Sequence, residues 1–77
     1  MKELLEYILK LIVSHPKEIK IEEQTVGEYS FQYLISAHQD DIGKIIGKEG
    51  KIIQAIRNVA KVMAIKEGKQ VRIEIKE

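Results

Sequence analysis

A short segment in the middle of the chain has the residue types and spacing of a phosphate-binding turn. Residues 47–50 read Gly-Lys-Glu-Gly, and two further lysines, Lys44 and Lys51, lie close to them. Glycine allows a backbone to turn sharply and to approach another molecule closely. A helix that starts directly after such a turn presents free N–H groups and the positive end of its dipole. Because phosphate is stabilised at such a helix start, the segment predicts a site for a phosphate-containing ligand.

Charge is distributed unevenly, and the positive half of the chain contains the glycine segment. Residues 1–43 carry four lysines and eight acids, whereas residues 44–77 carry nine basic residues and four acids. The net charge of +1 is small, but the local patch determines how strongly phosphate is attracted at short range. On its own this distribution favours an ordinary solvated surface; together with the glycine segment it favours phosphate binding.

No other residue pattern predicts catalysis. The segment from Gly43 to Lys48 is one residue shorter than a nucleotide-binding P-loop, and Glu49 stands where a magnesium-binding Ser or Thr belongs. The serines lack a nucleophile motif, and the carboxylates are scattered over faces expected to be exposed. His15 and His38 fall in separate loops, where surface or capping roles are expected rather than metal binding. We therefore expect a protein that is not an enzyme and uses no cofactor or metal.

Length and composition predict one small domain, residues 1–77, built around one core. A hydrophobic fraction of 44% argues against disorder, and the lack of cysteine excludes disulfides and thiolate metal sites. No apolar run reaches the ~20 residues that span a bilayer. Acidic Glu3 and Glu6 interrupt the apolar N-terminal segment, which argues against a signal peptide. We expect a soluble cytoplasmic protein without membrane insertion.

Hydrophobic periodicity predicts an α+β fold. Helical spacing and strict alternation of apolar residues indicate six elements. They are helices at residues 2–14, 39–46 and 51–67 and strands at residues 18–25, 29–37 and 71–76. The first two strands should form an antiparallel hairpin, and the helical crossover should place the third strand parallel to the second. The expected order is α-β-β-α-α-β, with a mixed three-stranded sheet covered on one face by three helices.

Two of the predicted helices have a wide apolar arc. In the long helix, one stripe of apolar residues at helical spacing is predicted to face the core. It consists of Ile52, Ile56, Val59, Ala60 and Met63. Ile53, Val62 and Ile65 fall outside this stripe, as Leu9 and Val13 do in the first helix. The residues outside the stripes are candidates for contact with a partner.

Three aromatic residues, Tyr29, Phe31 and Tyr33, share one face of the second strand. Aromatic side chains on a sheet can stack on RNA bases. The sheet also needs an apolar face against the helices, and we expect these residues to supply it.

The glycine segment and its flanks resemble the signature of KH domains. Residues 45–53 read Ile-Ile-Gly-Lys-Glu-Gly-Lys-Ile-Ile, between a strand pattern and a long helix pattern. KH domains bind RNA or single-stranded DNA, and their GXXG loop clamps the nucleic-acid backbone. The helix and strand that precede the β-α-α-β unit resemble the type II, prokaryotic arrangement. The resemblance covers essentially the whole chain and implies a type II KH fold.

Among KH domains, the chain resembles the small stand-alone bacterial proteins of the KH-domain protein A family. The likeness is carried by residues 43–50, 55–57 and 66–74. It implies a cytoplasmic RNA-binding protein, an RNA chaperone, that forms homodimers and also heterodimers with a larger KH-domain-containing RNA-binding protein. It further implies a link to cell-wall homeostasis and cell length. None of these cellular roles follows from spacing or composition.

The resemblance implies an RNA site in which the loop holds the backbone of about four nucleotides of single-stranded RNA. Lysines and helix N–H groups would contact phosphates, isoleucines would form an apolar floor, and an arginine would reach the backbone or a base edge. The residues are Lys44, Ile45, Ile46, Gly47, Lys48, Glu49, Gly50, Lys51, Ile53 and Arg57. Ile46 fits the core equally well. Since Glu49 repels phosphate, we expect modest, salt-sensitive affinity that assembly with a second KH domain increases.

The alternative is a protein–protein interaction module, in which the KH fold serves homo- or heterodimerisation with little RNA binding of its own. The wide apolar arcs of the helices favour this alternative, whereas the basic glycine loop favours RNA. The two functions can coexist in one chain.

Overall fold

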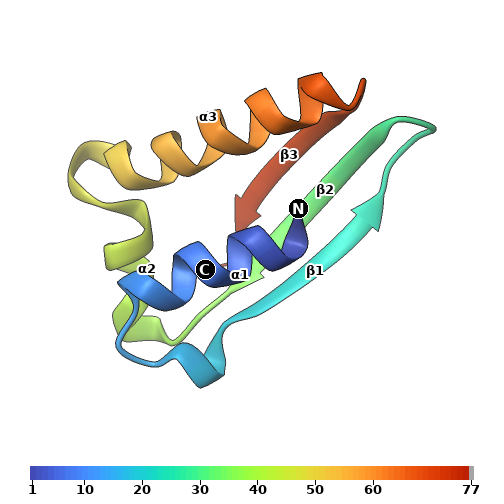
Figure 1. The fold of residues 1–77 in the computed structure, drawn as a ribbon. Helices are drawn as coiled ribbons and strands as arrows, with labels where there is room; N and C mark the ends of the chain where they lie inside the picture. Colours follow the sequence, from blue (N-terminus) through green and yellow to red (C-terminus); the bar gives the residue numbers. More distant parts are fainter. Residues whose placement is uncertain (77) are drawn as a thin grey trace.

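The computed structural model describes residues 1–76; Glu77, the last residue of the predicted domain, lies outside the described part. The elements follow the predicted order, with two short 3-10 turns in addition (Figure 1). They are α1 (Lys2–Ile12), η1 (Pro16–Glu18), β1 (Lys20–Thr25), β2 (Ser30–Ser36), α2 (Gln39–Ile46), η2 (Lys48–Gly50), α3 (Lys51–Lys66) and β3 (Gln70–Ile75).

The central strand of the sheet is β2. β1 pairs with it antiparallel, with Ile21 opposite Ile35, and β3 pairs with it parallel, with Ile73 opposite Tyr33. Figure 1 shows α1 and α3 over the same face of the sheet, and α2 at one end of it. These observations confirm the predicted α+β fold with a mixed three-stranded sheet.

The helices end where the local sequence disfavours further helix. α1 ends at Ile12, two residues earlier than predicted, because Val13 adopts an extended conformation ahead of Pro16. α3 ends at Lys66, and Gly68 follows with a φ of 70°. Glycine adopts this left-handed conformation without a steric penalty, which accounts for its place after the helix.

The core lies between the helices and the sheet and consists mainly of branched aliphatic side chains. Its buried members are Leu5, Leu9, Ile19, Ile21, Tyr33, Ile35, Ile45, Ile53, Ile56, Ala60 and Ile73. The Tyr33 hydroxyl donates a hydrogen bond of 2.8 Å to the Glu23 carboxylate. Burial, together with this hydrogen bond, raises the pKa of Tyr33 to about 12. Tyr33 therefore serves the core, and of the three aromatic residues only Tyr29 is exposed.

The buried face of α3 differs from the predicted stripe. Ile53, Ile56, Ala60 and Ala64 are buried, whereas three members of the predicted stripe are exposed. These three are Ile52, Val59 and Met63. Both stripes have helical spacing, so periodicity alone does not separate them. The observed face carries two alanines, whose small side chains allow α3 to approach the sheet closely.

The outer surfaces of the helices carry exposed apolar side chains. Val62 and Ile65 of α3 lie outside the core, as predicted, and Leu11 of α1 is also exposed. Leu9, which was predicted to lie off the main stripe of the first helix, is instead fully buried. Within residues 1–76, none of the helices combines the length and the apolar character that a membrane span requires.

Candidate nucleic-acid interface

The glycine loop joins α2 to α3 and depends on three residues with positive φ. Gly47 has a φ of 76°, Glu49 of 58° and Gly50 of 73°. A Cβ atom on Gly47 would lie 2.5 Å from Cγ1 of Ile52, closer than any real contact allows. Gly47 is thus required both for its backbone angle and for the close approach of α3. Glu49, which is not a glycine, holds a left-handed conformation that costs on the order of 1 kcal/mol.

The loop places the start of α3 at the molecular surface. Gly50 is the N-cap of α3 and has no side chain with which to cap the helix. The N–H groups of the first turn therefore receive no acceptor from the cap residue and remain suited to bind an anion.

The three lysines around the loop differ in their surroundings. Lys44 Nζ donates to the Ser14 hydroxyl and lies 3.6 Å from Oδ1 of Asp41. Lys51 Nζ lies 3.9 Å from Oε2 of Glu49, in a pair exposed to solvent that contributes little stability. Within residues 1–76, Lys48 is the one of the three without an ion pair. The predicted positive rim is therefore partly neutralised, and Lys48 is the lysine most available for a phosphate.

A groove lies between α3 and the edge strand β3. Its lining consists of Gln54, Arg57, Asn58 and Lys61 of α3 and of Val71, Arg72, Ile73, Glu74 and Ile75 of β3. Arg57 Nε donates a hydrogen bond of 3.2 Å to the backbone oxygen of Ile73. Arg57 thus connects the two walls of the groove. Lys61 adds positive charge, whereas Arg72 lies 3.9 Å from the carboxylate of Glu74, which also lines the groove and offsets it. The groove offers a strip of polar and charged groups along the helix that starts at the loop.

The isoleucines of the predicted apolar floor are mostly in the core. Ile45 is 0% exposed and Ile53 is 6% exposed, so neither presents a surface to a ligand. Ile46 is half-buried and packs against the core. The family resemblance implied that they form one apolar floor, but helix packing turns Ile45 and Ile53 inward. Apolar surface in the groove comes instead from the half-buried Val71 and Ile75.

Arg57 was predicted as a site residue, whereas its groove neighbours Gln54, Asn58 and Lys61 were not, although the sequence contains a signal for them. Gln54, Arg57, Asn58 and Lys61 follow the i, i+3, i+4, i+7 spacing of one helix face. This polar stripe is as regular as the apolar one and indicates a shared exposed face. Its partner across the groove, Arg72, has no comparable local signal because the pairing depends on the position of β3.

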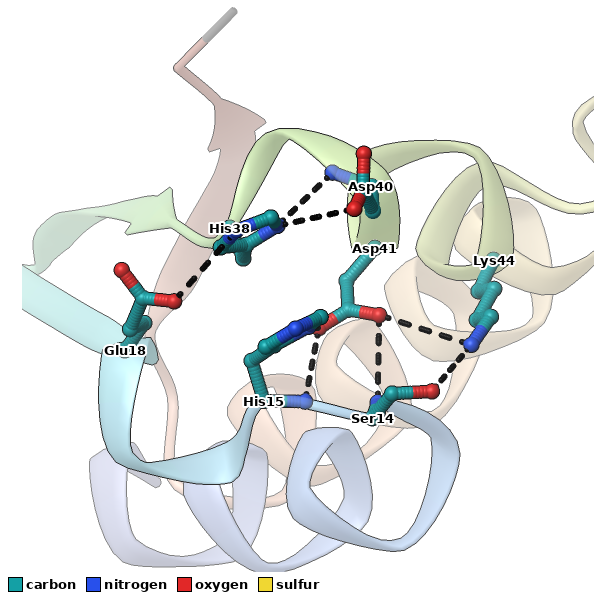
Figure 2. Close-up of polar contacts among 7 residues, drawn as sticks. All are labelled: Ser14, His15, Glu18, His38, Asp40, Asp41 and Lys44. Atoms are coloured by element: carbon teal, nitrogen blue, oxygen red, sulfur yellow. Dashed lines mark hydrogen bonds and ion pairs between the residues drawn. The ribbon is translucent and has the colours of Figure 1, made fainter.

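A buried carboxylate anchors the helix that leads into the loop. Asp41 of α2 is 0% exposed, and Figure 2 shows its contacts with the segment after α1. It accepts hydrogen bonds from the Ser14 N–H (3.1 Å), the His15 N–H (2.9 Å) and His15 Nδ1 (3.0 Å). Burial alone would raise the pKa of Asp41, but these hydrogen bonds outweigh it and lower the pKa to about 2. The ionised carboxylate thereby fixes α2, and with it the loop, against the end of α1.

The fold and the loop together define a class of protein. A GXXG turn between two helices, flanked by a mixed sheet in the order β1-β2-β3, is the architecture of a type II KH domain. The chain belongs to the KhpA/KhpB family of KH domains, whose family model matches residues 2–75. Membership of this family supports the expectation that the chain is not an enzyme.

Relatives cover the chain almost completely. The RNA-binding protein KhpA of Clostridium acetobutylicum is 47% identical over 75 residues, which are 97% of this chain and 99% of the relative. The RNA-binding protein KhpA of Chlamydia pneumoniae is 44% identical over 77 residues, which are 100% of this chain and 97% of the relative. No solved structure gives a significant match to the chain.

Proposed function

We propose that this chain binds single-stranded RNA, with the backbone at the glycine loop and the bases along the groove between α3 and β3. The observation that carries the proposal is that one helix, α3, begins at the loop and forms one wall of the groove. α3 starts at Lys51, directly after the loop, and its residues Arg57 and Lys61 line the groove that Arg72 completes. The names of the relatives, RNA-binding proteins, support RNA as the ligand.

Phosphate contacts in this proposal come from few groups. Lys48 and the first N–H groups of α3 hold the backbone, while Glu49 repels it and offsets part of the attraction. Arg57 serves a base edge or a sugar, since its guanidinium already lies at the groove wall. A short strand on such a site binds modestly, with most of the affinity lost at high salt.

The experiment measures binding of a fluorescent single-stranded RNA pool by anisotropy as a function of salt. The test variant combines Lys48→Asp with Glu49→Asp. Lys17→Asp in η1, exposed and outside the loop and groove, is the control because it changes the net charge by the same amount. We expect the loop variant to lose the salt-dependent signal and the control to keep it. Equal binding by all three proteins would refute the loop as the phosphate site.

The proposal extends to assembly and cellular role. We propose that the chain is a single KH domain that acts in the cytoplasm as an RNA chaperone, as a homodimer and with a larger KH-domain-containing partner. We further propose that it serves cell-wall homeostasis and control of cell length. The resemblance of residues 43–50 and 66–74 to small bacterial KH proteins supports these points, and the family's joint name supports the KH-domain-containing partner.

A second function, protein–protein interaction, is favoured by the apolar side chains on the outer faces of α1 and α3. Leu11, Val62 and Ile65 are all exposed. Sedimentation of the Val62→Asp variant, together with its RNA binding, separates the two functions. If the variant is monomeric and still binds RNA, the outer face of α3 is an interface distinct from the loop. An unchanged association state would remove Val62 from any interface.

A further inference from the structure

A cluster of metal-binding side chains lies away from the RNA groove. Ligand atoms of His15, His38 and Asp40 lie within 4.8 Å of one another. His15 follows α1, His38 is the N-cap of α2, and Asp40 belongs to the first turn of α2 (Figure 2). None of the three lines the groove. We propose that His15, His38 and Asp40 bind one divalent transition-metal ion, with Zn²⁺ as the ion of choice.

The buried carboxylate of Asp41 prepares His15 for this role. An ionised carboxylate only accepts hydrogen bonds, so Nδ1 of His15 donates its proton to Oδ2 of Asp41, 3.0 Å away. Nε2 of His15 then carries the free lone pair. A carboxylate behind a histidine fixes both its tautomer and its ring orientation, as is usual for metal-binding histidines. Asp41 is itself held by two backbone N–H groups, so the orientation of His15 is rigidly supported.

His38 and Asp40 supply the other two ligands. Nδ1 of His38 lies 3.7 Å from Oδ2 of Asp40, near the separation of about 3.4 Å between two ligands of a tetrahedral zinc ion. In the metal-free arrangement Nδ1 accepts the Asp40 N–H at 3.0 Å, and the metal takes the place of this hydrogen bond. The rings of His15 and His38 stack with centroids 3.8 Å apart. His15 stays against Asp41, and metal binding turns the His38 ring, whose side chain is 31% exposed, out of the stack.

The charge around the two rings favours a cation. Glu18 lies 3.7 Å from Nε2 of His38, so three carboxylates surround the pair, those of Glu18, Asp40 and Asp41. Lys44, which pairs with Asp41, offsets only one of them. Two imidazoles and one carboxylate suit zinc, nickel or copper rather than magnesium or calcium, which prefer oxygen ligands. A metal bound here crosslinks the segment after α1 to the start of α2.

The test is calorimetric titration of the full-length, untagged chain with ZnCl₂ and, separately, with MgCl₂. We expect saturable 1:1 binding of zinc and no saturable binding of magnesium. His15→Gln and His38→Gln should each weaken zinc binding at least about tenfold, since each removes one of three ligands. Glu28→Gln, an exposed acid of the β1–β2 turn, is the control and should bind as the natural chain does. Circular dichroism of each variant without metal establishes that it is folded.

Two further readouts make the result decisive. Because the chain contains only two histidines, zinc should shift the imidazole resonances of both in NMR spectra of the natural chain. This measurement does not depend on whether the variants fold. Saturating zinc should also raise the midpoint of thermal unfolding by about 5 °C or more, without changing the mass in solution. Any of three outcomes would overturn the proposal: zinc binding that is unchanged in both histidine variants, zinc binding that falls as much in Glu28→Gln as in the histidine variants, or zinc that joins two chains. RNA binding by His38→Gln, which leaves the hydrogen bonds of Asp41 in place, should equal that of the natural chain, so this test is independent of the proposed function.

Discussion

Replacing Asp41 with asparagine tests whether one buried carboxylate holds α2 in place. Asparagine has the same shape but only one acceptor oxygen, so whichever way the amide turns, its NH₂ group faces the N–H of Ser14 or of His15. Losing a hydrogen bond to a charged group and leaving an N–H without an acceptor costs roughly 2–4 kcal/mol. For a chain of this length, each kcal/mol lowers the midpoint of thermal unfolding by about 4–8 °C. We therefore expect Asp41→Asn to melt more than about 10 °C below the natural chain.

The neighbouring residue provides a matched control. The Asp40 side chain is 76% exposed, and its contact with His38 spans 3.7 Å, so Asp40→Asn should cost less than about 1 kcal/mol. Both variants are melted in EDTA, followed by circular dichroism, and unfolded in urea to obtain the free energy of unfolding. Similar losses in the two variants would refute the reasoning, because the effect would then come from charge near the start of α2 rather than from the buried hydrogen bonds.

Three further predictions concern the loop, the groove and the core. Gly47→Ala, with its φ of 76° and a Cβ 2.5 Å from a side chain of α3, should destabilise the chain by more than about 1 kcal/mol. Gly43→Ala, in a helix with nothing within 4 Å of the new Cβ, should stabilise it by about 0.5–1 kcal/mol in the same urea titrations; equal effects would contradict the loop geometry. Lys61→Ala should reduce the slope of log affinity against log salt for single-stranded RNA by about 0.7 if it contacts a phosphate, and an unchanged slope would exclude that contact. Because the pKa of Tyr33 is raised to about 12 in the folded chain, its stabilising effect is fully present below pH 10 and is lost as the pH rises through 12. The stability difference between the natural chain and Tyr33→Phe should therefore shrink over this pH range, and a constant difference would argue against a raised pKa of Tyr33.

The parts of the fold that depend on residues close together in the sequence were predictable. Alternation and helical spacing located every helix and strand within a few residues, and the crossover rule placed β3 parallel to β2. The face of α3 was not predictable, because Ile52 and Ile53 both continue an apolar stripe. Which of them is buried depends on the close approach of α3 to the sheet and to Gly47, and this approach is a property of the packed chain.

The sequence by itself determined the glycine loop, the helix that follows it and the polar stripe along that helix, since each depends on backbone preferences and spacing within a few residues. Only the tertiary structure decided that Lys44 bonds to Ser14, that β3 forms the second wall of the groove, and that His15 and His38 meet. Ser14 and Asp41 are 27 positions apart, and no local pattern encodes a contact of that separation. It arises because burying the apolar faces of α1 and α2 on one sheet brings their polar ends together, where the buried carboxylate must find its hydrogen-bond donors.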